Sequence, residues 1–463
     1  MLKQRSSFSG SLGFVLAAAG SAVGLGNIWR FPYLAAKDGG GLFLAVYIIL
    51  ALTFGFALLT TEIAIGRRTK QGPLTAYRRI FPPFKNLGII ASLVPFLILP
   101  YYCVIAGWVL KYTVVFVTGN GASSTADSYF TDFITSPVEP IVYTLIALSL
   151  VTYVIYRGVN KGIESISKTL MPILIVLILG ISIYSLTISY TDDSGVTRSG
   201  MDGLRVFVIP DFSNITLSGF LSVVVDAMGQ LFFSLSVAMG IMISYGSYVK
   251  DDVNLVGAIE KIEIFDTAVA FLAGVMVIPV VFVFMGHEGM DASGPGLIFV
   301  SMPKIFASMG TAGHIIGAVF FIMVLFAALT SAISIMEAVV SSIVDKKGIS
   351  RGRATIMEGA VALVIALLVC LGYNALYFDF ELPNGSNAQI LDILDYVSNN
   401  LLMPLLSLIT CVLIGWVAKP EKILDEITKN GEQFKRRGLY VVMIKYIAPI
   451  LLAILLLRSF GII

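Results

Sequence analysis

Long stretches without a single charged residue alternate along the chain with shorter segments rich in Lys and Arg. Residues 45–61, 87–109 and 360–378 are three such uncharged stretches, and apolar side chains dominate each of them. A run of about 18 or more apolar residues is long enough, as a helix, to cross the hydrocarbon core of a bilayer. The pattern therefore predicts a protein that crosses a lipid bilayer many times.

Applied to the whole chain, the pattern predicts eleven membrane-spanning helices. The expected spans are about 11–36, 41–66, 87–117, 140–156, 163–188, 219–249, 261–285, 311–343, 354–377, 390–417 and 439–460. Composition agrees with this prediction, because only 13% of the residues are charged, whereas soluble domains carry about 25%.

The basic residues of the connecting segments predict the orientation of these spans. With the N-terminus in the cytoplasm, 24 of the 31 Lys and Arg residues fall in cytoplasmic segments and 6 in external ones. Cytoplasmic loops of membrane proteins carry such an excess. We therefore expect a cell-membrane protein with its N-terminus inside and its C-terminus outside. Losing one span would invert every later loop, so the asymmetry also supports eleven spans.

Composition also excludes several classes of function. A net charge of +2 gives no electrostatic reason to expect a nucleic-acid partner. Cys103, Cys370 and Cys411 lie within hydrophobic segments and lack the spacing of metal ligands. No nucleophile–base pair or metal cluster is apparent, so we expect neither an enzyme nor an organic cofactor.

Two of the expected spans are interrupted by glycine and small polar residues. Residues 20–27 read GSAVGLGN and residues 229–240 read GQLFFSLSVAMG. Glycine loosens a helix, and broken backbone at this depth survives only where it lines a cavity or is buried in protein. The two interruptions match if residues 1–188 and 219–417 are inverted halves and 439–460 is an added helix. Such a pair points to the substrate site of a transporter.

Three motifs carry a resemblance to a known family: AVGLGNIWRFPY at 22–33, QLFFSLS at 230–236 and ALTSAISIM at 328–336. With these motifs the chain resembles the neurotransmitter:sodium symporters over nearly its whole length, and within them the bacterial multi-hydrophobic amino acid:sodium symporters. The resemblance implies an all-α, 5+5 inverted-repeat bundle with helices 1 and 6 broken at mid-membrane, plus one C-terminal helix. It also implies sodium-coupled amino-acid transport by alternating access.

The resemblance further implies two sodium sites, because a hard cation prefers several oxygen ligands. The first site would use Ala22, Asn27, Ser234, Asp266 and the substrate carboxylate. The second would use the carbonyls of Gly20, Val23 and Ala327 with the hydroxyls of Thr330 and Ser331. Taken without the resemblance, Thr330 and Ser331 favour the alternative, in which both hydroxyls bond to their own helix backbone.

Asp266 is the strongest single candidate for a functional residue, because a carboxylate within a membrane span usually marks a functional site. The alternative is a solvated helix end, since Glu260 and Glu263 are close in sequence. Asp266 also supplies a negative charge at the first sodium site, where a bacterial relative has a glutamate at the position of Ala270. We therefore expect transport that does not need chloride, and proton antiport through Asp266 is compatible with the same arrangement.

The resemblance also implies a substrate pocket between the two broken spans. Its expected residues are Ala22, Leu25, Gly26, Ile98, Tyr102, Phe233, Ser234, Ser236, Met239, Ser331 and Ile335. Amides near Leu25 and Gly26, together with the hydroxyl of Tyr102, would hold the substrate carboxylate, as exposed amides hold anions. Phe233 would form a lid. Methionine is unbranched and adaptable, so Met239 predicts room for bulky apolar side chains.

Gates and supporting residues follow from the same resemblance. Arg30 and Asp395 would form the outer ion-pair gate, and Arg5 with Asp345 the inner one, next to Tyr248 and Phe8. Glu62 would brace the broken helices by accepting backbone hydrogen bonds. Gly162 and Pro172, which are separated by nine residues in span 5, imply local unwinding that wets the inner sodium site. The alternative for this pair is a simple helix start and kink.

The sequence thus predicts a sodium-coupled symporter of neutral, mainly hydrophobic or aromatic L-amino acids. A non-transporting amino-acid sensor on the same scaffold is the alternative that it leaves open. A channel is disfavoured by ionic gates on both sides. The exact substrate, the sodium stoichiometry, the oligomeric state and the roles of Glu337 and Asp226 stay open.

Overall fold

A computed structural model of the chain describes residues 6–192, 195–210, 212, 216–286, 294–383 and 385–462. Arg5, predicted above as an inner gate residue, lies outside these described residues. Ten helices in the described part of the chain are long and apolar enough to cross a membrane. The bent pair Ser11–Ala22 and Gly26–Lys37 makes an eleventh, so the predicted all-α fold with eleven spans is confirmed.

The first five spans are built from consecutive helices, several of which contain a wider π-helical turn. They comprise α1 (Ser11–Ala22), η1 (Gly26–Arg30) and α2 (Phe31–Lys37); α3 (Gly41–Leu50), η2 (Ala51–Gly55) and α4 (Phe56–Thr69); α6 (Leu87–Val117); α8 (Glu139–Arg157); and η5 (Val159–Glu164) with α9 (Ser165–Thr187).

The remaining six spans follow the same construction. They comprise α11 (Leu217–Ser234) with α12 (Ile241–Ser247); α13 (Leu255–Met285); α15 (Thr311–Lys347); α16 (Arg351–Leu371); α17 (Ile390–Asp395), η8 (Tyr396–Leu402), α18 (Met403–Val412) and η9 (Leu413–Val417); and α20 (Arg437–Val442), η10 (Met443–Ile447) and α21 (Ala448–Ser459).

Short helices and two hairpins connect the spans. The helices are α5 (Pro73–Ile80), η3 (Pro82–Phe84), η4 (Gly121–Thr125), α7 (Tyr129–Thr135), α10 (Gly200–Val208), η7 (Leu297–Ser301), α14 (Met302–Ser308) and α19 (Glu421–Ile427). Strands β1 (Ser189–Thr191) and β2 (Thr197–Ser199) pair antiparallel with Tyr190 opposite Arg198, and β3 (Phe380–Glu381) pairs antiparallel with β4 (Asn387–Ala388).

The two largest errors in the predicted span boundaries are six residues each. Span 7, expected from residue 261, begins at Leu255 because the side chain of Asn254 accepts a 2.8 Å hydrogen bond from the amide of Gly257. Such an N-cap satisfies a donor that the helix itself leaves free. Span 9, expected to run to residue 377, ends at Leu371, where Gly372, a poor helix former, caps it.

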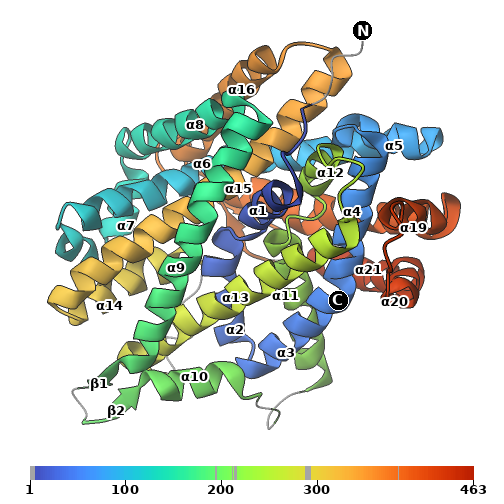
Figure 1. Cartoon of the computed structure of the whole chain (residues 1–463). Helices are drawn as coiled ribbons and strands as arrows, with labels where there is room; N and C mark the ends of the chain where they lie inside the picture. The colour runs from blue at the N-terminus through green and yellow to red at the C-terminus, as the bar shows by residue number, and fades with distance from the viewer. Residues whose placement is uncertain are drawn as a thin grey trace.

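Helix α1 lies at the centre of the bundle, as Figure 1 shows, and packs against α9, α13 and α15. All residues from Gly13 to Ala22 are buried. A helix that is apolar and buried on every side is surrounded by protein rather than by lipid. The elements α19, α20 and α21 lie at one edge of the molecule in the same view.

Both interruptions predicted from the sequence are present. Helix α1 ends at Ala22, and the two parts of span 1 differ in direction by 46°. In span 6, α11 ends at Ser234 and α12 begins at Ile241. Between them Ser236 and Ala238 have φ of +51° and +61°, a conformation that side chains with a Cβ seldom adopt.

The unwound segment of span 6 is held by hydrogen bonds from neighbouring elements. Glu62 of α4 accepts a 2.6 Å hydrogen bond from the amide of Ala238 through its Oε1. The hydroxyl of Ser236 donates to the carbonyl of Ser21, at 3.0 Å, and so joins the two broken spans. Buried backbone that is not helical needs such partners, and the two breaks therefore support each other.

Close packing fixes α12 against α4. A Cβ on Gly66 would lie 2.1 Å from the carbonyl oxygen of Ile243, and a Cβ on Gly246 would lie 2.4 Å from that of Ile63. Only glycine allows two backbones to approach this closely. These two segments therefore pack as one unit beside the break.

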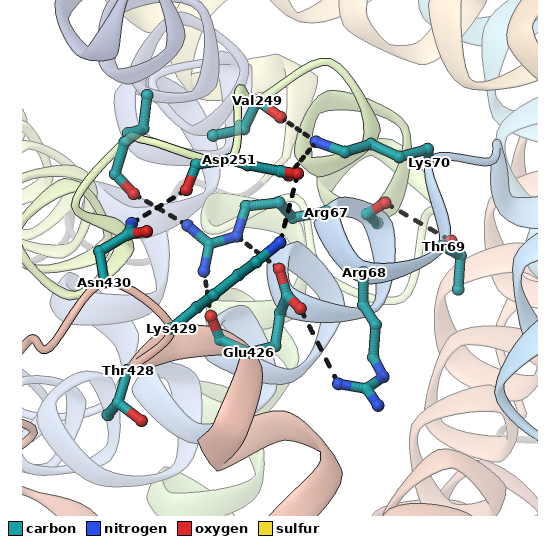
Figure 2. A network of polar contacts seen from close by, with 12 residues as sticks. Arg67, Arg68, Thr69, Lys70, Val249, Asp251, Glu426, Thr428, Lys429 and Asn430 are labelled. Atoms are coloured by element: carbon teal, nitrogen blue, oxygen red, sulfur yellow. Dashed lines mark hydrogen bonds and ion pairs between the residues drawn. The ribbon is translucent and has the colours of Figure 1, made fainter.

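A polar network joins the end of α4 to α19 and to the loop before α13 (Figure 2). The buried guanidinium of Arg67 contacts the carboxylate of Glu426 at 2.7 Å and donates to the carbonyl of Val253 at 2.8 Å. Lys70 lies 2.8 Å from Asp251, and the hydrogen bond from its ammonium lowers the pKa of that carboxyl below its ordinary value. The network thus ties three chain segments together.

Candidate functional site

A buried carboxylate lies where the two broken spans meet. Asp266 of α13 is completely buried, as are Asn27 of η1 and Ser234 at the end of α11. The Oδ1 atom of Asp266 accepts hydrogen bonds from the Asn27 side-chain amide at 2.9 Å and from the Ser234 hydroxyl at 2.5 Å. The alternative of a solvated helix end therefore does not describe Asp266.

The chemistry of this cluster fits a cation. The Oδ1 atom of Asn27 is buried and has no hydrogen-bond partner among the described residues. Together with the carboxylate and the Ser234 hydroxyl it presents oxygen atoms around a fixed negative charge, the ligands that hard cations prefer. The carbonyl of Ala22, the last residue of α1, accepts only a 3.1 Å bond from Gly24 among the backbone amides described.

Sequence reasoning missed one member of this cluster. The hydroxyl of Tyr47, on α3, lies 3.0 Å from the Ser234 hydroxyl and donates to Oδ2 of Asp266 at 3.2 Å. Tyr47 stands in an apolar run and resembles a core aromatic. The one available signal was its hydroxyl, since a buried tyrosine needs a polar partner.

A second group of oxygens lies between α1 and α15. The hydroxyl of Thr330 donates to the carbonyls of Phe326 and Ala327, at 3.0 and 3.1 Å, and the hydroxyl of Ser331 donates to the carbonyl of Ser21 at 3.0 Å. A Cβ on Gly20 would lie 3.6 Å from the Cβ of Thr330.

The hydrogen bonds of these hydroxyls leave both alternatives raised by the sequence open. A hydroxyl that donates its hydrogen to a carbonyl keeps two lone pairs for a cation. Thr330 bonds within its own helix, while Ser331 reaches across to α1. Gly20 of α1 lies against Thr330, and the carbonyl of Ala327 accepts the Thr330 hydroxyl. Val23 follows directly on the end of α1 and is buried. The structure therefore brings α1 and α15 together at Gly20, Ala327, Thr330 and Ser331, and a second sodium site there stays a prediction.

Seven of the eleven predicted substrate residues line a small cavity of about 10 Å³, whereas Ala22, Leu25, Gly26 and Ser234 are not among its walls. Its walls are Ser21, Ile98, Tyr102, Phe233, Ser236, Met239, Ser331 and Ile335. No wall residue carries a charge. The hydroxyl of Tyr102 accepts a 3.3 Å hydrogen bond from the amide of Leu25, and the side chain of Gln230 donates to the carbonyl of Gly26 at 2.9 Å. Ser21 and Gln230 are two contacts that sequence reasoning missed.

A larger cavity of about 270 Å³ lies on the other side of Phe233. Arg30, Tyr101, Tyr102 and Asp395 are among its walls. The ring of Phe233 packs against Gly26, where a Cβ would approach it to 2.6 Å, and lies 6.3 Å from the ring of Tyr102. Phe233 therefore separates the large cavity from the small one, as a lid would.

Comparison with known proteins decides the family. The model of the sodium:neurotransmitter symporter family matches residues 5–135 and 132–462. The chain belongs to the sodium:neurotransmitter symporter family. It is accordingly a sodium-dependent symporter that crosses the membrane many times.

Individual relatives agree with this membership. An uncharacterized sodium-dependent transporter of Bacillus subtilis (strain 168), YhdH, is 31% identical over 462 residues, which is 98% of each chain. The creatine transporter of Torpedo marmorata is 26% identical over 473 residues, covering 91% of this chain and 74% of that one. The crystal structure of MhsT in complex with L-phenylalanine matches with a TM-score of 0.86 and 35% identity, over 99% and 100% of the two chains.

The predicted outer gate of this symporter is not closed by a direct ion pair. The Oδ1 atom of Asp395 accepts hydrogen bonds from the hydroxyl of Tyr101 at 3.0 Å and from the side chain of Asn399 at 2.5 Å. Arg30 lies between the 270 Å³ cavity and a second cavity of about 430 Å³. Within the described part of the chain, Arg30 and Asp395 share no contact short enough for a salt bridge.

The opposite side of the symporter is closed by aromatic and charged residues. Phe8 is buried against the rings of Tyr245 and Tyr248, with centroid distances of 5.7 and 6.2 Å, and its amide donates to the carbonyl of Tyr248 at 3.1 Å. Asp345, the predicted partner of Arg5, accepts a 2.5 Å hydrogen bond from the amide of Gly72.

Glu337, whose role the sequence left open, lies in this closed region. It accepts a 2.5 Å hydrogen bond from the hydroxyl of Tyr248 and pairs with both terminal nitrogens of Arg351. Arg351 also donates to the carbonyl of Ile155 at 2.9 Å. Glu337 and Arg351 thereby link spans 4, 6, 8 and 9. The sequence alone could not predict this role, because Arg351 lies on a different helix from Glu337.

The two motif residues of span 5 lie within continuous helix. Gly162 belongs to the wide turn η5 and packs against span 4, where a Cβ would lie 2.1 Å from the carbonyl oxygen of Val154. Pro172 lies inside α9. Since proline lacks an amide hydrogen, the carbonyl four residues earlier loses its helical partner. Unwinding between these two residues stays a prediction.

Proposed function

We propose that this symporter carries neutral, hydrophobic or aromatic L-amino acids together with two sodium ions, by alternating access and without chloride. The observation that carries the proposal is an uncharged pocket at the break of span 6, where Ser234, next in sequence to the wall residue Phe233, donates a hydrogen bond to the buried carboxylate of Asp266. Asp266 and Asn27 provide charge and oxygen ligands on one side, and Ile98, Met239 and Ile335 provide an apolar wall on the other.

The polar end of the pocket suits the carboxylate of an amino acid. The amide of Leu25 points to the hydroxyl of Tyr102, at 3.3 Å, beside the break in span 1. A bound carboxylate accepts hydrogen bonds from both groups, as anions do at exposed amides. Its negative charge then completes the oxygen ligands around sodium next to Asn27. Substrate and sodium therefore stabilise each other's binding, which is the physical basis of coupling.

The apolar end of the pocket suits a hydrophobic side chain. A charged substrate side chain would lose its hydration without gaining a partner there, which is costly. The relative MhsT was crystallised with L-phenylalanine, in agreement with this choice. The cavity of about 10 Å³ holds little more than one water molecule. Binding of a bulky substrate therefore requires Met239 and Phe233 to change rotamer, which an unbranched methionine does readily.

Alternating access is supported by the unequal state of the two gates. On one side the 270 Å³ cavity reaches Phe233, and Arg30 is separate from Asp395. On the other side Phe8, Tyr248 and Glu337 are packed and hydrogen-bonded. With the N-terminus in the cytoplasm, as the basic residues suggest, this is the arrangement of a transporter closed to the inside. We propose that the halves 1–188 and 219–417 are related by inverted symmetry.

Chloride independence follows from the position of Asp266. Two cations and a zwitterion leave an excess of positive charge in a buried place, which needs a fixed counter-charge. The Asp266 carboxylate, hydrogen-bonded to Tyr47, Asn27 and Ser234, is such a charge. No dissolved anion is needed when the protein supplies its own.

A competition assay tests the choice of substrate. Purified protein is assayed for sodium-dependent binding of labelled leucine, with unlabelled glycine, alanine, leucine, phenylalanine, tryptophan, aspartate and lysine as competitors. We expect leucine, phenylalanine and tryptophan to compete best. Binding in which glycine or alanine outcompetes leucine and tryptophan would reject the proposed pocket.

The variant Met239→Phe tests whether Met239 lines the pocket for the substrate side chain. A rigid ring at position 239 reduces the adaptable volume, so tryptophan and phenylalanine should compete less well while alanine is retained. Met357→Phe is the matched control, because Met357 lies on α16 with 45% of its surface exposed. Equal competition profiles for the two variants would show that Met239 does not line the side-chain pocket.

A further inference from the structure

Three basic side chains from separate segments gather where α4, α5 and α19 meet. Arg68, near the end of α4, donates to the carbonyl of Lys422 at 3.3 Å. Lys422, at the start of α19, donates to the carbonyl of Ile80 at 3.2 Å. Arg79, next to Ile80 at the end of α5, donates to the carbonyl of Thr69 at 3.1 Å. These bonds connect α4, α19 and α5 in a ring, and we call Arg68, Arg79 and Lys422 the cationic cradle.

The charge of the cationic cradle is poorly neutralised within the described part of the chain. Glu426 lies 3.9 Å from Arg68 and is the one carboxylate there that is close enough for an ion pair with the cradle. Glu426 also contacts the buried Arg67 at 2.7 Å, and Figure 2 shows the guanidinium of Arg68 extending away from that pair. Glu421 and Asp425, the other carboxylates of α19, are exposed.

Most hydrogen-bond donors of the cradle are also unused. Arginine has five N–H donors and a lysine ammonium has three. Each of the three side chains uses one donor for the carbonyl bonds given above, among the described residues. The cradle therefore presents excess positive charge together with free donors, which suits an anion with several oxygen acceptors.

A pair of exposed aromatic residues close to the cradle in the chain marks the end of a membrane span. Trp416, in η9 at the end of span 10, packs edge to face against Tyr446, with 5.6 Å between the ring centroids, and both residues are more than half exposed. Such rings are typical of the boundary between hydrocarbon and headgroups. Span 10 ends at Val417 and α19 begins at Glu421, so Lys422 follows this boundary within a few residues. The cradle is thereby placed at the depth of lipid headgroups.

We propose that the cationic cradle binds the phosphate of an anionic phospholipid in the leaflet on this side of the membrane. Guanidinium groups bind phosphate oxygens through pairs of parallel hydrogen bonds, and each basic residue near a membrane surface adds to the attraction for anionic lipid. A bound phosphate bridges the ends of α4 and α5 to α19 and so holds α19 at the membrane surface. This binding does not depend on which substrate the symporter carries.

Quenching of Trp416 fluorescence by brominated lipids tests this binding in the full-length protein. The protein is reconstituted into phosphatidylcholine vesicles that contain the same small fraction of either brominated phosphatidylglycerol or brominated phosphatidylcholine. We expect stronger quenching by phosphatidylglycerol, because the cradle concentrates anionic lipid beside η9. The variant Trp416→Phe gives the background from Trp29 and Trp108, the other two tryptophans of the chain.

Removal of the charges of the cradle should remove the preference for phosphatidylglycerol. Arg68→Gln, Arg79→Gln and Lys422→Gln should each lower the relative affinity for this lipid by about fivefold. The triple variant should be quenched equally by the two lipids. Arg68→Lys combined with Lys422→Arg keeps all three charges and should retain most of the preference, which a role limited to the shape of these side chains would not explain.

A matched control separates the cradle from the general charge of this side of the protein. Lys346→Gln, Lys347→Gln and Arg353→Gln together remove three exposed cations from the end of α15 and the start of α16. This control triple variant has the same net charge as the cradle triple variant. We expect it to prefer phosphatidylglycerol as strongly as the native protein does.

Three results would overturn the proposal. The first is equal quenching of the native protein by the two lipids, and the second is a preference that the cradle variants retain. The third is loss of the preference in inorganic phosphate but not in potassium chloride of the same ionic strength, which indicates a site for free phosphate instead of lipid. The single variants, each of which removes one hydrogen bond, decide between these results if the triple variant does not fold.

Discussion

At the level of single residues, the proposed sodium chemistry depends on the charge of Asp266 and on hydroxyls that face the broken backbone. Asp266 is the completely buried carboxylate that Asn27, Ser234 and Tyr47 surround with hydrogen-bond donors. A buried charge of this kind is retained only when its partners compensate for lost hydration. Substitutions at this site can therefore show whether sodium coupling depends on the charge of Asp266 or only on the shape of its side chain.

Asp266→Asn keeps the shape of the site and removes its charge. We expect sodium-driven amino-acid uptake to fall by roughly tenfold or more, because a buried cation that loses its counter-charge is destabilised by several kcal/mol. Chloride restores part of the rate if it can enter the vacated position. Initial uptake rates with sodium chloride and with sodium gluconate measure both effects.

The control for this substitution is Asp132→Asn, which alters an exposed carboxylate of α7. Native protein and Asp132→Asn should transport equally in chloride and gluconate. A native protein that requires chloride would contradict the assignment of Asp266 as the fixed counter-charge.

Thr330→Ala combined with Ser331→Ala removes the hydroxyls of the proposed second sodium site. The remaining carbonyls are too few to replace the hydration shell of sodium, so sodium-dependent substrate binding should collapse while the protein still folds. Thr187→Ala is the control, since this exposed hydroxyl bonds only within its own helix. Unchanged sodium affinity in the double variant would show that the second site lies elsewhere.

Some residues of the candidate site could be predicted from the sequence, and others could not. Asp266 was predictable because a carboxylate in an apolar span is conspicuous. Tyr47 was not, because its ring resembles the core residues around it and only its hydroxyl contacts Asp266. The pair of Glu337 and Arg351 could not be predicted for a different reason. It joins two helices, and no local sequence pattern shows that these helices pack against each other at this point.

At the level of elements, the interrupted spans and their neighbours form the working parts. Gly66 and Gly246 allow α4 and α12 to pack closely beside the break. The network of Figure 2 then connects this pair to α19 and to the loop before α13 through Arg67. Helix α19 therefore belongs structurally to the part of the protein that carries the broken span 6.

Substitution of two adjacent arginines measures how much this network contributes to the stability of the protein. Arg67→Ala leaves the carboxylate of Glu426, which is 6% exposed, without its buried partner, and should lower stability by about 3–5 kcal/mol. Arg68→Ala removes a 40% exposed side chain that lies 3.9 Å from the same carboxylate, and should change stability by no more than about 0.5 kcal/mol. Thermal unfolding of the purified variants in detergent measures the difference.

A double variant tests whether the unpaired charge of Glu426 causes the loss of stability in Arg67→Ala. Glu426→Gln added to Arg67→Ala removes the stranded charge and should recover part of the loss. Equal unfolding temperatures for Arg67→Ala and Arg68→Ala would show that the buried pair contributes nothing beyond the exposed one.

The element scale was the most predictable one. Long uncharged runs located every span, and small polar residues located both breaks. The errors lie at helix ends, where single side chains decide. Asn254 extends span 7 towards the N-terminus by capping it, and Gly372 ends span 9 although apolar residues continue beyond it. Hydrophobicity alone reports neither effect.

At the level of the whole molecule, two gates in different states enclose one binding region. The side that carries Phe8 and Tyr248 is closed by packed rings and by the Glu337–Arg351 pair. The side that carries Arg30 retains a cavity of about 270 Å³ above Phe233. The distribution of Lys and Arg predicts which side faces the cytoplasm, but the state of each gate depends on distances that only the fold supplies.

Sodium-driven uptake into proteoliposomes tests the central claim most directly. Protein is reconstituted into vesicles loaded with potassium, and uptake of labelled leucine, phenylalanine or tryptophan is followed after dilution into sodium or into potassium buffer. The account predicts accumulation above the external concentration with an inward sodium gradient, in chloride and in gluconate alike, and none in potassium. Accumulation that is equal in sodium and potassium, or sodium-dependent binding without any uptake, would contradict it.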